Sequence, residues 1–124
     1  MGYRSDCRLR TTKEGYEIMK KEIDKYLKKA KKEKEFDYEP KNIFEYCNKI
    51  VVENEIVTAD WNYMKWYDDY TEIMAFNNAL GILQEKDIDY QFMRVGENLE
   101  DIEERWSVNN DSFDSFYVSR EFEG

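Results

Sequence analysis

Residues 55–67 read EIVTADWNYMKWY, and the alternation of their side chains between two faces decides the fold class. One face carries Val57, Ala59, Trp61, Tyr63, Lys65 and Tyr67, and the other carries Ile56, Thr58, Asp60, Asn62, Met64 and Trp66. A period of two is that of a β-strand. The first set is apolar apart from Lys65, so we expect it to face the core and Trp66 to lie on the opposite face.

Helical patterns flank this strand on both sides. Upstream, Thr11 and Glu14 form a capping-box pattern ahead of apolar residues at three- and four-residue steps. These are Tyr16, Met19, Ile23, Tyr26, Leu27 and Ala30. Downstream, Asp69 and Glu72 are expected to cap a helix over residues 70–85. Its apolar stripe is Ile73, Phe76, Leu80 and Leu83, and Gly81 within it suggests close packing.

Three further strands are expected, at residues 3–10, 88–95 and 116–122. The first alternates Tyr3, Ser5, Cys7 and Leu9 with charged residues, the second ends at Gly96, and the third follows the turn-prone stretch 109–115. Residues 42–50 are expected to form a short helix, and the acidic segment 97–106 to be helical or loop-like. The prediction is an α+β domain with one sheet of about four strands and two main helices on one face. A ferredoxin-like split βαβ arrangement is the nearest named topology.

Composition fits a single domain over residues 1–124. Hydrophobic residues make up 41% and aromatic residues 16% of the chain, so a ring-rich core is expected despite the 38% of charged residues. The net charge of −9 repels phosphate backbones on average, so we expect no direct contact with nucleic acid and favour basic partners. No apolar run approaches the ~20 residues of a membrane span, and Arg4, Asp6 and Arg8 are unlike a secretory signal.

The residues that most enzymes and metal sites need are scarce. The chain has no histidine, which removes the commonest general base and the commonest metal ligand. Its two cysteines, Cys7 and Cys47, show no CxxC spacing and are expected to be reduced thiols of a cytosolic protein. We therefore expect a binding protein with no enzyme activity, no cofactor and no metal site.

Two stretches are candidate binding surfaces. The aromatic segment is Trp61, Tyr63, Lys65, Trp66 and Tyr67, whose residue types are typical of interface hot spots unless the rings pack in the core. The second group is Arg94, Glu97, Glu100, Asp101, Glu103 and Glu104, in which Arg94 is expected to pair with Glu97 or Asp101. An acidic strip of this kind fits a basic groove of a partner. Its spacing does not match an EF-hand loop.

Two smaller features leave alternatives open. Tyr3, Arg4 and Asp6 near the start are suited either to hydrogen-bonding a small polar ligand or to fixing the first strand to the sheet. The helix that follows has a lysine-rich face, which is either a contact for phosphate or an acidic partner, or a solvated surface. The lysines of that face are Lys20, Lys21, Lys25, Lys28, Lys29, Lys31 and Lys32.

Four stretches occur in a fixed order: MGYRSDCRL (1–9), WNYMKWYDDY (61–70), YQFMRVGENLEDIEE (90–104) and REFE (120–123). In this pattern the chain resembles a family of small, uncharacterised phage and prophage proteins with Lys-Trp-Tyr and Arg-x-Gly-Glu blocks. Lys65, Trp66 and Tyr67 match the first block, and Arg94, Gly96 and Glu97 match the second. Cys7 stands where the family pattern often has an aliphatic residue. The resemblance implies action in the cytoplasm of a bacterial host, often against host defences.

These observations favour a non-enzymatic phage protein that binds and inhibits a host factor, with a defence nuclease as the favoured target, in the manner of an anti-CRISPR protein. The acidic residues of 97–104 and the exposed aromatic residues near 61–67 would form the contact. The alternative is a small-molecule binder, such as a sponge for a nucleotide immune signal, with aromatic stacking and Arg94 or Arg4 at a phosphate. That alternative is compatible with a homodimer, since its pocket would lie between protomers or under a loop. A pocket lined by rings and arginine favours the ligand, and a flat acidic surface favours the inhibitor.

Overall fold

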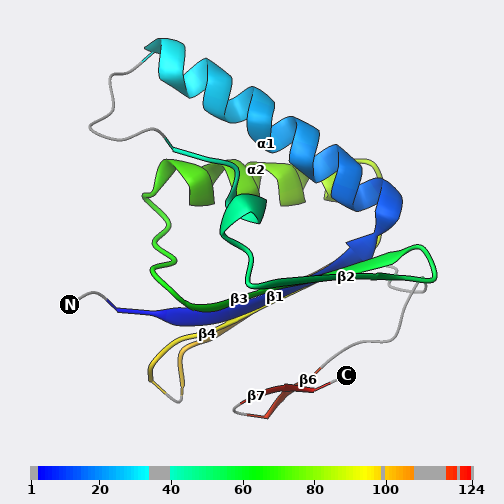
Figure 1. Ribbon diagram of the computed structural model, residues 1–124, viewed down its shortest axis with the longest axis vertical. Coiled ribbons are helices and arrows are strands. Elements are labelled where there is room, and N and C mark those ends of the chain that lie inside the picture. The colour runs from blue at the N-terminus through cyan, green and yellow to red at the C-terminus, as the bar shows by residue number, and fades with distance from the viewer. Residues whose placement is uncertain (1–2, 34–39, 99, 108–116, 120, 124) are drawn as a thin grey trace.

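The computed structural model describes residues 3–33, 40–98 and 100–107, and the backbone of 117–119 and 121–123. In chain order its elements are β1 (Ser5–Thr12), α1 (Lys13–Glu33), the 3-10 helix η1 (Ile43–Tyr46), β2 (Lys49–Glu53), β3 (Ile56–Met64), α2 (Thr71–Glu85), β4 (Tyr90–Val95), β5 (Ile102–Trp106), β6 (Tyr117–Ser119) and β7 (Glu121–Glu123). Helices α1 and α2 lie together on one face of the main sheet (Figure 1). The predicted α+β class, with two helices on one face of one sheet, is confirmed.

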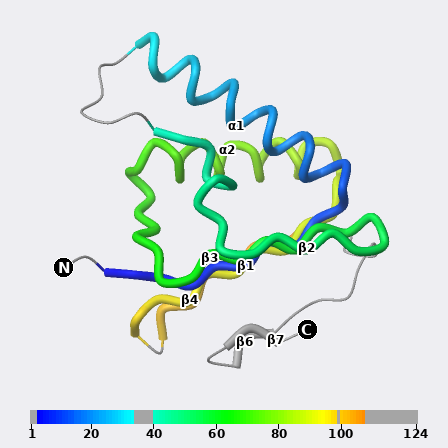
Figure 2. The backbone as a smooth tube through the Cα atoms, viewed as in Figure 1, coloured from blue at the N-terminus to red at the C-terminus, as the bar shows by residue number. Residues whose placement is uncertain are grey.

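The main sheet has five antiparallel strands in the order β2-β3-β1-β4-β5. Both connections through a helix skip a strand: β1-α1-β2 passes over β3, and β3-α2-β4 passes over β1 (Figure 2). The order β2-β3-β1-β4 is that of the ferredoxin-like βαββαβ unit. Strand β5 adds a fifth member beside β4. Strands β6 and β7 form a separate two-stranded sheet.

The core lies between the sheet and the two helices. Alternate residues of β1 and β3 point into it, among them Cys7, Leu9, Ala59 and Trp61, all fully buried. The helices contribute the predicted stripes, with Met19, Ile23 and Leu27 from α1 and Ile73, Phe76, Leu80 and Leu83 from α2. The strand and helix periods therefore located the core correctly.

The predicted helix signals were less accurate. The backbone N–H of Gly15 donates to Thr12 Oγ1 at 3.0 Å, whereas Thr11 belongs to β1 and its hydroxyl donates to the Asp89 carbonyl at 2.7 Å. The cap is thus one residue later than predicted. Helix α2 begins after Tyr70 with no side-chain cap, so the prediction for Asp69 was wrong. A Cβ at Gly81 would meet nothing within 4 Å, so this glycine does not permit close packing.

Two strands of the main sheet were missed. The expected helix over 42–50 is only the short η1, and β2 begins at Lys49 with every residue exposed. The segment expected to be helical or loop-like contains β5, which pairs with β4. The prediction of one strand at 116–122 within the main sheet was wrong, because β6 and β7 pair with each other in a separate sheet. The turn-prone stretch 109–115 lies outside the described residues. Neither helix that the structure describes is long and apolar enough to cross a bilayer.

Candidate functional site

The alternation of β3 breaks near its end, and this break decides which aromatic residues are exposed. Cys7 lies opposite Trp61, but Ser5 lies opposite Met64, so the pairing of β1 with β3 shifts between them. Tyr63 adopts a positive φ of 52° within this shift. As a result its side chain is 68% exposed. The prediction that Tyr63 faces the core was wrong.

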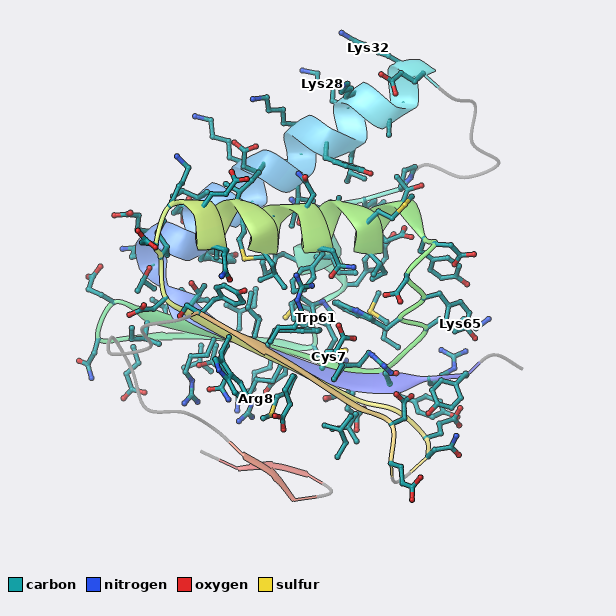
Figure 3. The ribbon with its side chains drawn as sticks, turned by 180° about the vertical axis from the view of Figure 1, so that it is seen from behind. Cys7, Arg8, Lys28, Lys32, Trp61 and Lys65 are labelled. Atoms are coloured by element: carbon teal, nitrogen blue, oxygen red, sulfur yellow. The ribbon has the colours of Figure 1, made fainter. Side chains whose placement is uncertain are left out.

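Trp61 and Trp66 lie in the same core, not on opposite faces as predicted. Their ring centroids are 5.2 Å apart, and both pack against Phe76 at 5.8 and 5.2 Å. Trp66 also stacks on Phe92 at 5.6 Å. The buried indole N–H of Trp61 donates to the Ile43 carbonyl at 2.9 Å. Figure 3 shows Trp61 between the sheet and the helices. We call Trp61, Trp66, Phe76 and Phe92 the ring cluster, and it is structural.

Three contacts hold the unusual conformation of Tyr63. Its backbone N–H donates to Asp6 Oδ1 at 2.7 Å. The guanidinium of Arg4 lies 5.1 Å from the centroid of the Tyr63 ring, and Arg4 Nη1 donates to the Tyr63 carbonyl at 3.4 Å. A positive φ costs a non-glycine residue of order 1–3 kcal/mol, and such strain concentrates at binding and catalytic sites. Tyr63 is therefore the first residue to consider in a binding site.

A pocket of about 530 Å³ lies beside Tyr63, where β3 ends and α2 begins. It is lined by Arg4, Tyr46, Asn48, Asn62, Tyr63, Met64, Lys65, Tyr70 and Glu72. Of the aromatic segment, the pocket thus includes Tyr63 and Lys65 but neither tryptophan. Tyr67 is not among the lining residues, and its ring contacts that of Tyr70 at 5.0 Å. Lys65 extends outward from the loop after β3 (Figure 3).

The lining combines two cations with rings and amides in a protein of net charge −9. Arg4 and Lys65 are the cations, and Glu72 is the single carboxylate. Burial, and then the charge of Glu72, raises the pKa of the Tyr46 hydroxyl. This phenol therefore stays protonated at neutral pH and is able to donate a hydrogen bond. The pocket offers stacking surface, hydrogen-bond donors and positive charge.

The remaining lining residues were not anticipated. Tyr46, Asn48, Asn62, Met64, Tyr70 and Glu72 come from η1, the turn before β2, the end of β3 and the start of α2. Arg4 had been noted as a hydrogen-bonding residue near the N-terminus. These segments are far apart in the sequence and meet only through the strand order, so no local pattern would have grouped them.

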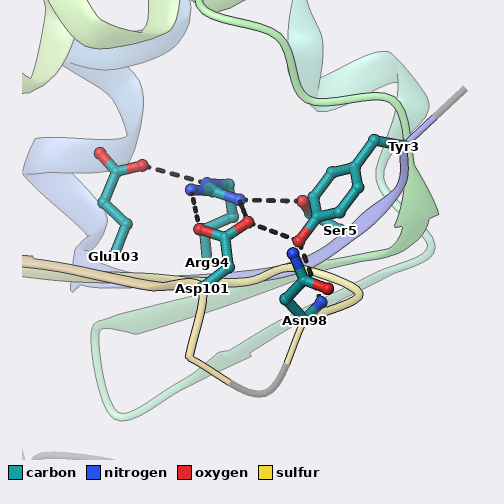
Figure 4. Close-up of polar contacts among 6 residues, drawn as sticks. All are labelled: Tyr3, Ser5, Arg94, Asn98, Asp101 and Glu103. Atoms are coloured by element: carbon teal, nitrogen blue, oxygen red, sulfur yellow. Dashed lines mark hydrogen bonds and ion pairs between the residues drawn. The ribbon is translucent and has the colours of Figure 1, made fainter.

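Arg94 is the centre of a polar cluster at the other side of β1 (Figure 4). Its Nη2 lies 2.9 Å from Asp101 Oδ1 and its Nε lies 3.1 Å from Glu103 Oε1. Nη1 also donates to Ser5 Oγ at 3.1 Å. The hydroxyl of Tyr3 donates to Asp101 Oδ2 at 2.6 Å. We call Tyr3, Ser5, Arg94, Asp101 and Glu103 the arginine cluster. It confirms the expected Arg94–Asp101 pair but not a pair with Glu97.

The pKa shifts of Arg94 and Asp101 and the close packing at Gly96 both indicate strong contacts within the arginine cluster. Hydrogen bonds from Arg94 and then from Tyr3 lower the pKa of Asp101. The hydrogen bond with Asp101 raises the pKa of Arg94, although burial opposes it. A Cβ at Gly96 would collide with the Asp101 carboxylate and the Tyr3 hydroxyl. The Gly of the Arg-x-Gly-Glu block is thus needed for this close approach.

The acidic segment is divided by these contacts. Asp101 and Glu103 face Arg94, and Glu97 accepts a hydrogen bond from the Arg4 backbone N–H at 3.0 Å. Glu97, Glu100 and Glu104 are exposed. Among the described residues, no group of three potential ligands is placed to hold a metal ion. Three of the six candidate residues of this stretch, Arg94, Asp101 and Glu103, therefore pair with one another within the arginine cluster.

The remaining candidate groups lie outside both clusters. The lysines of α1 point away from the sheet, as Lys28 and Lys32 show in Figure 3. On the face without helices, Arg8 pairs with Asp60 at 2.7 Å, each side chain being 14% exposed. Both cysteines are free, and burial raises the pKa of the fully buried Cys7 thiol. A second pocket on α1 is lined by Lys25, Lys29 and the half-buried Tyr26, but it also holds the carboxylates Glu22 and Glu33, so its charges balance.

Comparisons with protein-family models, curated proteins and solved structures find no match for this chain.

Proposed function

We propose that the protein binds an anionic small molecule that carries an aromatic ring, with a nucleotide as the class that fits best. The observation that carries this proposal is the exposed Tyr63 ring, held beside Arg4 at the wall of a 530 Å³ pocket. The volume lies within the usual range for small-molecule sites. The resemblance to phage proteins would make such a ligand a nucleotide signal of host immunity, which the protein sequesters.

Each part of the pocket has a role in this proposal. The Tyr63 ring provides a face on which a base stacks, and one such contact contributes about 1–3 kcal/mol in nucleic-acid binding proteins. Arg4 and Lys65 provide positive charge for a phosphate, and arginine is able to bind two phosphate oxygens at once. The side chains of Asn48 and Asn62 line the same wall and offer amide groups to the edge of a base.

The strained backbone adds support for Tyr63 as a binding residue. A glycine would adopt its φ of 52° without cost, so stability alone would favour glycine at this position. A large ring is kept there instead, mostly exposed to solvent. An exposed ring held at such a conformational cost is accounted for when the ring contacts a ligand.

The proposal is tested by calorimetric titration of the purified protein with mononucleotides, cyclic nucleotides and linked dinucleotides. Nucleosides without phosphate, and inorganic phosphate alone, separate the contribution of the ring from that of the charge. We expect a nucleotide to bind more tightly than either part. Absence of heat and of thermal stabilisation across the whole panel would refute this function.

A matched set of variants locates the site. Tyr63→Gly removes the ring while relieving the backbone strain, so a loss of binding cannot be attributed to unfolding. We expect it to weaken binding by about tenfold or more. Arg4→Gln and Lys65→Gln are expected to reduce the affinity and its dependence on salt. Lys28→Gln, on the distant face of α1, is the control and leaves binding unchanged.

We propose a second function, inhibition of a host protein such as a defence nuclease, on a different observation. Ile102 and Trp106 are 44% and 54% exposed on β5, and the exposed Glu104 lies between them on the same face of the strand. An exposed tryptophan beside a carboxylate is suited to a partner with a basic, partly apolar groove.

This second function needs variants that spare the arginine cluster. Glu100→Lys with Glu104→Lys reverses exposed charges only, and it should reduce capture of a candidate nuclease in native mass spectrometry. Glu33→Lys with Glu85→Lys, at the exposed ends of α1 and α2, makes the same change in net charge and is the control. Equal capture by both variants would exclude the acidic contact.

A further inference from the structure

Strand β2 is an edge of the main sheet and is exposed along its whole length. It is the outermost strand beside β3, and no residue of Lys49–Glu53 is buried. Ile50, Val51 and Val52 are 39%, 38% and 55% exposed, so apolar branched side chains are exposed on both faces of the strand. Such an edge is a template for pairing with another strand. What pairs with it depends on the directions of its backbone groups and on its charges.

The turn after β2 fixes those directions. Asn54 and Glu55 both have positive φ, at 52° and 63°, in the two-residue turn that joins β2 to β3. This is a type I′ hairpin turn, and the flanking residues Glu53 and Ile56 form its hydrogen-bonded pair. Because hydrogen-bonded and non-hydrogen-bonded pairs alternate, Ile50 and Val52 direct their N–H and C=O groups away from β3. The outer edge of β2 therefore presents two residues ready to pair.

The sequence of β2, Lys-Ile-Val-Val-Glu, is complementary to itself in the antiparallel direction. When two copies are centred on Val51, Ile50 of each copy lies opposite Val52 of the other. The outward N–H and C=O groups of these residues then form hydrogen bonds between the copies. The same register places Lys49 of each copy opposite Glu53 of the other, on the same face as Val51. Opposite charges and branched apolar residues are favourable cross-strand pairs.

We infer that the occupant of this edge is a second copy of the chain, paired through β2 about a two-fold axis at Val51. Such an interface is isologous, because each contact occurs twice. The two five-stranded sheets become one continuous sheet, and because the two-fold axis is perpendicular to it, the helices of both copies lie on the same face. The charge pattern selects the antiparallel register, and the apolar residues provide the buried area. This inference does not depend on the proposed ligand.

The opposite edge of the sheet lacks this complementarity. Centring two copies of β5 on Glu104 would place that carboxylate against its own copy. Like charges directly opposite each other destabilise a strand pair. In addition, the flanking Glu103 and Arg105 already bind Arg94 and Asn77 within the same chain. The molecule therefore has one edge suited to self-association and one that opposes it.

A charge exchange measured by sedimentation velocity tests the inference. The wild-type chain is expected to dimerise as its concentration rises. Lys49→Glu and Glu53→Lys each place like charges at both ends of the strand pair, and each should weaken the dimer by about tenfold. The double variant restores both pairs and should recover the dimer. A wild-type chain that stays monomeric from micromolar to millimolar concentration overturns the inference, and so does a double variant no better than either single variant.

Cross-linking tests the register independently. Val51 faces its own copy in a non-hydrogen-bonded pair, where Cα atoms lie about 4.5 Å apart, within reach of a disulfide. Val51→Cys in a Cys47→Ser background should therefore give a covalent dimer with a mild two-electron oxidant. Val52→Cys is the control, because it is more exposed yet lies diagonal to its own copy. Equal or faster cross-linking through Val52→Cys would indicate random collision and reject the register.

Discussion

The ring cluster and the arginine cluster occupy the same face of the sheet but hold it together by different physics. The ring cluster joins β3, β4, α2 and the loop after β3 through aromatic contacts of 5.0 to 5.8 Å between ring centroids. The arginine cluster joins the N-terminal strand to β4 and β5 through ion pairs and hydrogen bonds. Helices cover the first, while the second is partly exposed. Only the second should respond to pH and salt.

The largest expected effect is on the ring cluster. Trp66→Ala removes a buried ring that contacts three others and leaves a cavity among them. We expect a loss of about 3–5 kcal/mol in the free energy of unfolding. Urea denaturation measures it, and the loss should be the same at pH 7 and at pH 4. A loss below about 1 kcal/mol would contradict the central role of this ring.

A smaller effect is expected from removal of the cation in the arginine cluster. Arg94→Met keeps the length of the side chain but leaves Asp101 and Glu103 facing each other without a positive charge. We expect a loss of about 2 kcal/mol, less than for a fully buried pair because these side chains are partly solvated. Added salt should recover part of this loss by screening the two carboxylates, whereas salt should not rescue the Trp66 variant.

Acid distinguishes the two clusters further. Hydrogen bonds from Arg94 and Tyr3 lower the pKa of Asp101 in the folded protein. The Asp101 carboxylate therefore contributes fully to the free energy of unfolding above its unfolded pKa of ~3.9, and this contribution is lost as the pH falls through the folded pKa. Asp101→Asn should lower the free energy of unfolding by about 1 kcal/mol at pH 7. The difference from wild type should shrink below about pH 4. Denaturation midpoints at both pH values measure this. A difference that stays constant into acid would show that the charge of Asp101 is not what stabilises the cluster.

The smallest effect on stability is expected at the exposed Tyr63 ring, which belongs to neither cluster. Tyr63→Gly should leave the free energy of unfolding unchanged or raise it by up to about 1 kcal/mol, since glycine accepts a positive φ. Thermal denaturation without ligand measures this. A large loss would mean that the Tyr63 ring supports the fold, which would weaken its assignment to a binding site.

Alternation and helical periodicity predicted the central part of the molecule well. Strands β1, β3 and β4 and both helices were expected, because the sequence of each shows the period of a strand or of a helix. Strand β2 was missed because it has no buried face, and β5 because its sequence is dominated by charge. Trp66 was misplaced because a local shift in strand pairing reverses the alternation after Trp61.

The candidate sites were predicted less well, for a related reason. The sequence grouped residues that are neighbours in the chain, such as Trp61 with Tyr63 and Glu103 with Glu104. The fold divides both groups between core, clusters and surface. The pocket instead draws Arg4 and Tyr46 to the end of β3 across a large separation in sequence. The strand order of the sheet brings these residues together, and no local sequence pattern encodes the strand order.

The burial of Cys7 has a practical consequence. Its thiol is fully enclosed in a central strand and held in the protonated form, so an alkylating reagent is able to reach it only during rare openings of the sheet. Cys47, on the loop before β2, is only half-covered and should be modified first. The rate of Cys7 alkylation therefore reports how often the central sheet opens. Mass spectrometry measures this rate from the mass added to the protein, so no further label is needed.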